Sequence, residues 1–216
     1  MPQKIPMNKS VAHQVAAYLL EIEAIKLSVK KPFTWASGWK SPIYCDNRLS
    51  LSYPEIRTFI KEQLANAIKN EFAGVEAIAG VATAGIPQGA LVAEVLGLPF
   101  IYVRSKPKEH GMTNMIEGKV IKKQKVVMVE DLISTGGSSI KAAKAVQEAG
   151  MKVLGMAAIF TYGFDVAKEN FEKENIKVVT LSNYASMLEE ATDLKYISEK
   201  ELISLKAWRV DPQTWK

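Results

Sequence analysis

Residues 76–160 alternate between short apolar runs and stretches with helical periodicity, and this alternation constrains the fold more than any other feature of the chain. Short continuous apolar strands separated by amphipathic helices are typical of a parallel sheet that is covered on both faces. The apolar runs and the helices between them fall at 76–82, 86–97, 100–103, 126–129, 137–149 and 153–160. The sequence therefore predicts an α/β fold with a doubly wound, mostly parallel sheet. In such sheets ligands bind beyond the carboxyl ends of the strands, at a switch in strand order.

The residues before this alternation predict a small N-terminal hood. Ser10 is a good N-cap, and apolar residues at helical spacing predict a helix over 10–27. The segment FTWASGWKSPIYCDNR at 33–48 predicts short strands joined by a turn. Pro54 then suits the first turn of a helix over 54–72.

The chain shows no internal repeat and no long linker rich in Pro, Gly or Ser. We therefore expect a single domain over residues 1–216. Its core spans about 54–182, and its hood consists of about 10–50 together with C-terminal elements.

The composition excludes several classes of protein. With 48% hydrophobic and 24% charged residues, the chain is typical of a globular protein and unlike a disordered or collagen-like one. No run approaches the roughly 18 apolar residues of a membrane span, and the start MPQKIPMNKS has no apolar signal region. Cys45 is the only cysteine, so no intrachain disulfide can form. We expect a cytoplasmic protein with no membrane partner.

The charge distribution favours a small anionic ligand over nucleic acid. The net charge is +5, but the 28 basic and 23 acidic residues are interspersed, which is unlike a basic stripe for nucleic acid. Residues 101–130 hold seven basic and three acidic side chains, so positive charge gathers in the middle of the chain. This pattern suits a small polyanion.

Residues 126–139, VVMVEDLISTGGSS, place two carboxylates after an apolar strand, then hydroxyls and two glycines, then a helix. Backbone N–H groups in a glycine-containing turn form an anion site, and the helix N-terminus adds its positive dipole. Gly136 and Gly137 allow close approach of the backbone, because they lack a Cβ. The hydroxyls of Ser134, Thr135, Ser138 and Ser139 can donate to phosphate oxygens. The segment therefore predicts a phosphate site.

The carboxylates narrow the choice of ligand. The nucleotide-binding pattern G-x-x-x-x-G-K-[ST] and the dinucleotide pattern G-x-G-x-x-G are both absent. Phosphate repels carboxylates, so Glu130 and Asp131 are better explained by sugar hydroxyls or Mg²⁺. The predicted ligand is a ribose phosphate. The alternative is an ordinary strand-to-helix turn in which Asp131 and Ser134 satisfy backbone donors.

The same ordered string resembles the 5-phosphoribosyl-1-pyrophosphate (PRPP) signature of the type I phosphoribosyltransferases. The resemblance implies that Glu130 and Asp131 hold the ribose 2- and 3-hydroxyls and that 134–138 wraps the 5-phosphate. The implied PRPP-binding residues are Arg104, Lys108, His110, Glu130, Asp131, Leu132, Ile133, Ser134, Thr135, Gly136, Gly137 and Ser138.

The polar stretch RSKPKEHGMTNMIEG at 104–118 has the profile of a mobile lid that closes over pyrophosphate, although a solvated charge run has the same composition. Its Arg-x-x-x-Lys-x-His-Gly pattern resembles the catalytic loop of the orotate phosphoribosyltransferase family. The segment 33–48 is similar to the hood of that family. The resemblance implies catalytic roles for Lys108, His110 and Asp131.

The implied activity is transfer of the 5-phosphoribosyl group from PRPP to orotate, within UMP biosynthesis. Ser134 would lie near orotate, and Mg²⁺ would be held mainly by PRPP and water, with no protein ligand. Thr83, Ala84 and Gly85 would offer backbone N–H groups to pyrophosphate, unless they form only a helix-start turn. The family resemblance also implies a homodimer in which the lid of one subunit completes the site of the other.

Several positions depart from the family pattern. Relatives carry lysines where this chain has Ala36, Ala84 and Ser105, and an arginine in the region of 160–162. Lys40, Lys106 or backbone amides are candidate substitutes for the contacts of those side chains, and the residues that grip the orotate carboxylate stay open. Two alternatives remain: a regulator that senses PRPP, and a phosphoribosyltransferase for a purine base.

Overall fold

The computed structural model describes residues 10–35, 38–106 and 115–215. They fall into two compact units. The hood unit comprises the residues up to Arg57 together with those from Ser182 onward, and the core unit comprises Thr58–Leu181. The expectation that the two form one domain stays a prediction.

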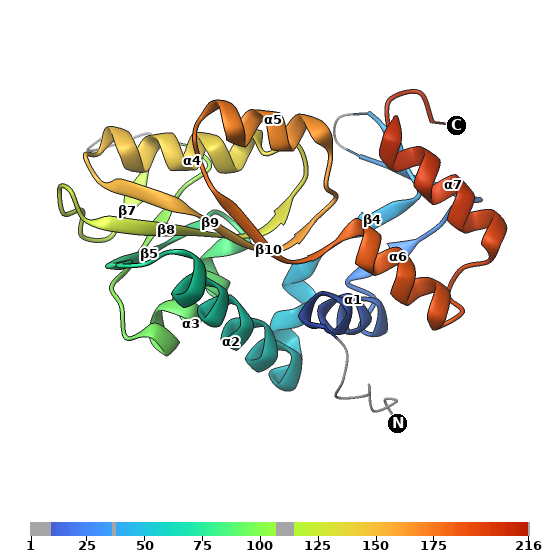
Figure 1. Ribbon diagram of the computed structural model, residues 1–216, viewed down its shortest axis with the longest axis horizontal. Coiled ribbons are helices and arrows are strands. Elements are labelled where there is room, and N and C mark those ends of the chain that lie inside the picture. Colours follow the sequence, from blue (N-terminus) through green and yellow to red (C-terminus); the bar gives the residue numbers. More distant parts are fainter. Residues whose placement is uncertain (1–9, 36–37, 107–114, 216) are drawn as a thin grey trace. The chain divides into compact units, whose positions relative to one another are not determined.

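The core unit is built on one sheet, in which the described residues form six strands in the order β10-β9-β8-β5-β6-β7 (Figure 1). The strands are β5 (Ala77–Val81), β6 (Phe100–Val103), β7 (Ile116–Glu117), β8 (Lys125–Ile133), β9 (Lys152–Thr161) and β10 (Val178–Asn183). β5 pairs in parallel with β6 and with β8, and β8 pairs in parallel with β9. β7 is antiparallel to β6. The predicted doubly wound, mostly parallel sheet is confirmed.

Helices cover both faces of this sheet (Figure 1). α2 (Pro54–Glu71) and α3 (Gly85–Leu96) lie on one face, and α4 (Gly137–Glu148) and α5 (Asp165–Lys173) lie on the other. Under α4 and α5 the side chains of Val146 and Phe171 join the strand residue Met128 in one buried cluster. On the other face α3 approaches β5 closely, because a Cβ on Gly89 would lie 3.1 Å from the Cα of Gly80.

The strand order switches direction at the centre of the sheet. The chain runs from β5 through α3 to β6 on one side, whereas β8 on the other side of β5 leads through α4 to β9. The carboxyl ends of β5 and β8 therefore face the crevice where ligands bind in sheets of this kind.

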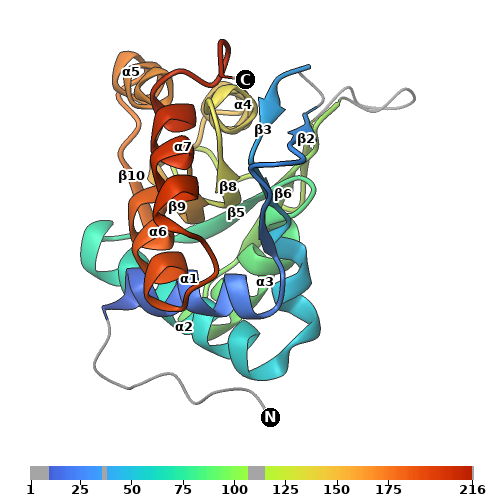
Figure 2. The same cartoon turned by 90° about the vertical axis from the view of Figure 1, so that its right-hand side faces the viewer.

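The hood unit combines segments from both ends of the described chain. They are α1 (Val11–Glu21), β1 (Ile25–Leu27), β2 (Phe33–Thr34), β3 (Lys40–Ser41), β4 (Ile43–Cys45), the 3-10 helix η1 (Asn47–Ser52), α6 (Tyr184–Asp193) and α7 (Glu199–Val210). α1 packs against α6, and α7 follows α6 (Figure 2). The Ser182 hydroxyl donates to the carbonyl of Ala12 at 2.7 Å.

Trp208 of α7 is fully buried in this unit. Its indole N–H donates to the carbonyl of Lys40 at 3.1 Å, and its ring contacts those of Trp35 and Tyr184. A buried tryptophan needs such a partner for its N–H, and here it ties α7 to β3.

Two local expectations are wrong. The helix predicted over 10–27 ends at Glu21, because Glu23 takes a left-handed conformation with φ 55° and Ile25–Leu27 pairs with Ile43–Cys45 as a strand. The polar stretch 104–118 also contains the short strand β7, which the apolar pattern does not indicate.

The described parts of the chain include no helix that combines the length and the apolar character needed to cross a membrane.

Candidate active site at the carboxyl ends of the central strands

Three neighbouring strands of the core unit end side by side. Val81 pairs with Val103, and Gly80 pairs with Val129, so the register continues to align Ala82 with the backbone of Arg104 and of Asp131. The N–H of Ala82 donates to the carbonyl of Val103 at 2.8 Å. Because adjacent strands lie about 4.8 Å apart, the three loops predicted from sequence start at one edge of the sheet.

The acidic pair belongs to β8 itself, which extends through Ile133 and so beyond the apolar run 126–129. Glu130 is only 6% exposed, whereas Asp131 is half-buried. One Glu130 oxygen, Oε1, accepts from the backbone N–H of Asp131 at 3.0 Å, and the other, Oε2, accepts from the Ser139 hydroxyl at 2.9 Å. The two carboxylates therefore have different surroundings, although they are neighbours in sequence.

These surroundings raise the pKa of Glu130 well above its ordinary value. The main cause is burial, which disfavours the charged form, and the neighbouring carboxylate of Asp131 acts in the same direction. The hydrogen bond from Ser139 opposes the shift. A titratable group with a perturbed pKa at the end of a central strand is a mark of a functional site.

The predicted phosphate loop lies between β8 and α4. Gly136 is the N-cap of α4 with φ 82°, a conformation that favours glycine, and a Cβ there would lie 2.7 Å from the Phe171 ring. Gly136 has no side chain that could accept from the N–H groups of the first turn. Such a helix start presents backbone donors and the positive end of the dipole to an anion.

Side chains of α5 pack against this loop and support it. Asn170 Nδ2 donates to the carbonyl of Thr135 at 3.1 Å, and the Phe171 ring lies under Gly136. These two residues are not predicted from sequence, because no local pattern links them to a loop about 35 residues earlier.

The loop after β5 contacts the end of β8 through backbone atoms. A Cβ on Gly85 would collide with the carbonyl oxygen of Val129, and it would lie 3.3 Å from the Cα of Glu130. Only glycine permits this approach, so Gly85 sets the distance between the predicted pyrophosphate loop and the acidic pair.

The remaining predicted residues are placed as follows. The Arg104 guanidinium lies 3.8 Å from Glu117, and both Ser105 and Lys106 are exposed. The Ile133 side chain is buried in the core cluster, so a ligand contact there would fall to its backbone. Thr135 is half-buried, as are Leu132 and Ser134, and Gly137 is exposed, as is Ser138. Lys108 and His110, and Ala36 in the hood, lie outside the described residues.

Two observations bear on the open positions. Phe160, in β9, and Tyr162, just after it, are buried aromatic residues. The arginine that relatives carry in this region therefore has no counterpart at either position. Lys40, a candidate substitute, donates to the Thr34 hydroxyl at 2.8 Å in the hood unit.

Ser139 was expected to donate to phosphate, and that expectation is wrong for this structure, because its hydroxyl is buried and donates to Glu130.

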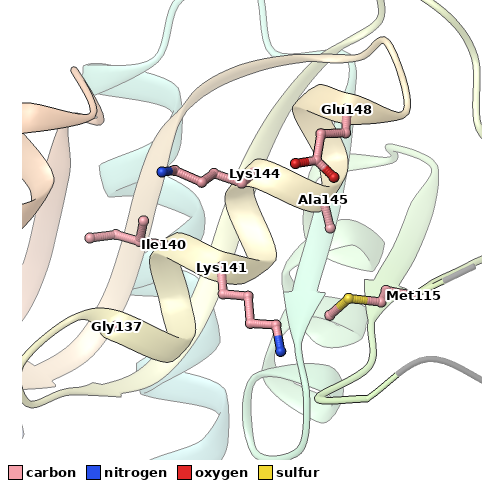
Figure 3. A pocket seen from close by; sticks show the side chains of 7 residues that line it. All are labelled: Met115, Gly137, Ile140, Lys141, Lys144, Ala145 and Glu148. Atoms are coloured by element: carbon pink, nitrogen blue, oxygen red, sulfur yellow. The ribbon is translucent and has the colours of Figure 1, made fainter.

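A hollow of about 380 Å³ runs along α4 and begins at Gly137 (Figure 3). Lys141 points toward Met115 across it, while Lys144 points away and pairs with Glu174 at 2.7 Å. Apart from Gly137, its lining was not predicted from sequence.

Comparison with known proteins gives the family. Residues 50–196 match the model of the phosphoribosyl transferase domain. The chain is 56% identical over 207 residues to an orotate phosphoribosyltransferase of Porphyromonas gingivalis, covering 96% of this chain and 99% of the relative. It is 55% identical over 206 residues to one of Listeria innocua, covering 95% and 99%.

Solved structures of orotate phosphoribosyltransferases also align with this chain. An orotate phosphoribosyltransferase of Aeropyrum pernix aligns with a TM-score of 0.74 at 27% identity, covering 85% of this chain and 99% of that one. The Mycobacterium tuberculosis enzyme in complex with PRPP aligns with a TM-score of 0.63 at 22% identity, covering 82% and 98%, and this likeness concerns the fold. By its domain match and by its identity to relatives over nearly the whole length, the chain belongs to the orotate phosphoribosyltransferases.

Proposed function

We propose that this chain is a Mg²⁺-dependent enzyme that transfers the 5-phosphoribosyl group from PRPP to orotate, giving orotidine 5-monophosphate and pyrophosphate in pyrimidine biosynthesis. The relatives named orotate phosphoribosyltransferase support the enzyme class. The observation that carries the proposal in this chain is the acidic pair of β8 followed directly by the start of α4 at the switch point of the sheet.

The reaction joins N1 of orotate to C1 of the ribose while the bond from C1 to pyrophosphate breaks, with inversion at C1. Such a displacement at an anomeric carbon passes through an oxocarbenium-like state. Asp131 and Glu130 accept hydrogen bonds from the ribose hydroxyls and stabilise the cationic sugar. The backbone N–H groups and hydroxyls of 134–138 hold the 5-phosphate, and Ser134 also lies near orotate.

The leaving pyrophosphate gains charge as it departs, so cations and N–H groups must face it. Thr83, Ala84 and Gly85 supply backbone donors, and Arg104 supplies a guanidinium whose pairing with Glu117 is loose at 3.8 Å. Lys108 and His110, outside the described residues, complete the clamp.

The residues present fit a magnesium ion that is held mainly by substrate oxygens and water. The ribose hydroxyls and the pyrophosphate that the proposed site holds are themselves oxygen ligands of the kind that Mg²⁺ takes. Mg²⁺ commonly keeps several waters and substrate oxygens as ligands. When bound, it would neutralise charge on the pyrophosphate.

The proposal includes a cytoplasmic homodimer in which residues 104–118 of one subunit close over the active site of the other. It rests on the resemblance of this segment to the catalytic loop of the family.

The test is the fall in orotate ultraviolet absorbance when purified protein, PRPP and Mg²⁺ are mixed, with adenine, xanthine and uracil as parallel substrates. Consumption of orotate alone, and only with PRPP and Mg²⁺ present, is the expected result. Turnover of a purine base instead would overturn the choice of base. PRPP binding without turnover of any base would indicate a PRPP-sensing regulator.

A further inference from the structure

We propose that Ser139 is a positioning residue for the phosphoribosyl site, because its hydroxyl fixes the buried Glu130 carboxylate and so joins the acidic pair to the first turn of α4. This inference rests on the proposed function. It adds a residue that touches neither the ribose nor the phosphate and that acts through Glu130.

The first observation is the burial of the pair. Ser139 is 1% exposed, and its Oγ lies 2.9 Å from Oε2 of Glu130, which is itself 6% exposed. With the Asp131 N–H on Oε1, each carboxylate oxygen has one protein donor. A carboxylate has about four lone-pair sites, and the Asp131 side chain also interacts with this one, so part of its acceptor capacity stays for a ribose hydroxyl. The two donors fix the orientation of the carboxylate and still leave it acceptor capacity.

The second observation is the direction of the Ser139 hydroxyl. A serine within a helix commonly bonds back to the carbonyl four residues earlier, here that of Thr135. That carbonyl accepts from Asn170 instead, while Ser139 reaches a side chain nine residues earlier in β8. Its neighbour Ser138 is exposed. Ser139 is therefore distinct from the hydroxyls that face a phosphate.

The hydrogen bond from Ser139 to Glu130 connects the two ends of the predicted PRPP loop. It joins the residue before Asp131 to the residue after Ser138, so everything between the acidic pair and the phosphate-binding turn is closed into a ring by one side-chain contact. Loss of the hydroxyl frees both the Glu130 carboxylate and the first turn of α4. Ribose and phosphate contacts then lose their mutual spacing.

The test uses the full-length protein with Ser139→Ala, Ser139→Cys and Ser139→Thr. Cysteine is close to serine in size but a weak donor, and threonine keeps the hydroxyl. The matched control is Ser182→Ala, which removes another fully buried serine hydroxyl, bonded to Ala12 in the hood unit. Steady-state kinetics give KM for each substrate, calorimetry gives the Kd of PRPP with Mg²⁺ and without orotate, and thermal unfolding gives Tm.

For the Ala and Cys variants we expect KM and Kd for PRPP to rise about 10-fold, as for loss of a hydrogen bond to a charged group. Threonine should restore PRPP binding to within about 3-fold of the parent. Ser182→Ala should lower Tm and leave both KM values unchanged. If Ser139→Ala and Ser139→Cys lower Tm only, with the Kd of PRPP unaltered, Ser139 is merely structural and the proposal fails.

A double-mutant cycle with Glu130→Met, which leaves no acceptor for the Ser139 hydroxyl, tests whether the effect passes through Glu130. If it does, Ser139→Ala on the Glu130→Met background should change PRPP affinity far less than on the parent. Full additivity would overturn the proposal. Because these readouts use PRPP alone, they are independent of which base the parent enzyme consumes, which the absorbance assay tests separately.

Discussion

Glu130 is a carboxylate that is almost fully buried, at 6% exposure, next to a second carboxylate. A buried charge is costly unless it is hydrogen-bonded, and here two donors offset part of the cost. The raised pKa of Glu130 shows that a penalty remains. Two neighbouring carboxylates that lower the free energy of unfolding are typical of a functional site, where residues are placed for catalysis rather than for folding stability.

Glu130→Gln should therefore stabilise the protein at alkaline pH and weaken its activity. Folding raises the pKa of Glu130, so the favourable contribution of its protonated form is complete below the unfolded pKa of about 4.3 and is lost as pH rises through the folded pKa. Glutamine is neutral at every pH. We expect a higher Tm than the parent at pH 8 and a difference that shrinks toward pH 4, with kcat/KM for PRPP reduced about 10-fold or more.

Thermal unfolding across this pH range checks the prediction, with Glu148→Gln as the control, since Glu148 is an exposed carboxylate on α4. A Tm difference between Glu130→Gln and the parent that grows as pH falls would contradict the assigned sign.

The turn from β8 to α4 depends on α5. The Asn170 amide and the Phe171 ring lie against Thr135 and Gly136, so the loop that faces the ligand is supported by a helix that follows it in the chain. The left-handed conformation of Gly136 lets the chain turn from the loop into α4, whose first N–H groups have no partner within the helix.

The two adjacent glycines of this turn should respond differently to alanine. Gly136→Ala puts a Cβ at positive φ, which costs about 1–2 kcal/mol, and also against the Phe171 ring. Gly137→Ala meets nothing within 4 Å and has no positive φ. We expect Gly136→Ala to lower Tm by several degrees and Gly137→Ala to leave Tm within about 2 °C, as measured by calorimetry. Equal losses of Tm would refute the steric assignment.

The sequence predicts the strands and helices of the core unit well, because continuous apolar runs and helical periodicity both report on local burial. It predicts poorly where a distant partner decides the structure. Residues 25–27 fit the helical pattern but pair with β4, and Ile116 and Glu117 form a strand only because β6 lies beside them.

The same limit holds at the site. The string from Glu130 to Ser138 can be recognised in sequence, since carboxylates, hydroxyls and glycines follow one another locally. The hydrogen bond from Ser139 to Glu130 cannot, because hydroxyls throughout this segment have the same chemistry and only the packing of α4 on the sheet selects one of them.

The described residues proposed for PRPP all belong to one unit, Thr58–Leu181. The proposed homodimer would add residues 104–118 of a second chain to this set. If the site is shared, two subunits that each lack a different essential residue can form one intact active site together. A site built within one chain cannot be restored in this way.

Mixing Lys108→Ala with Asp131→Ala tests this sharing. Each variant alone should be nearly inactive. After the subunits exchange at equal amounts, about a quarter of all sites should carry both intact residues, and orotate turnover should recover to that extent. No recovery, although exchange of differently tagged subunits is demonstrated, would place each site within one chain.

The hood unit is discontinuous, and this matters while the protein is being made. Its first part, up to Arg57, leaves the ribosome well before Ser182 does, and α6 and α7 must still follow. At about 5–20 residues per second, the intervening segment takes roughly 6–25 s to synthesise. During that interval the apolar face of α1 has no α6 to cover it, whereas Thr58–Leu181 emerges as a continuous stretch. The first part of the hood unit therefore waits for its packing partner α6 until the whole of the core unit has been synthesised.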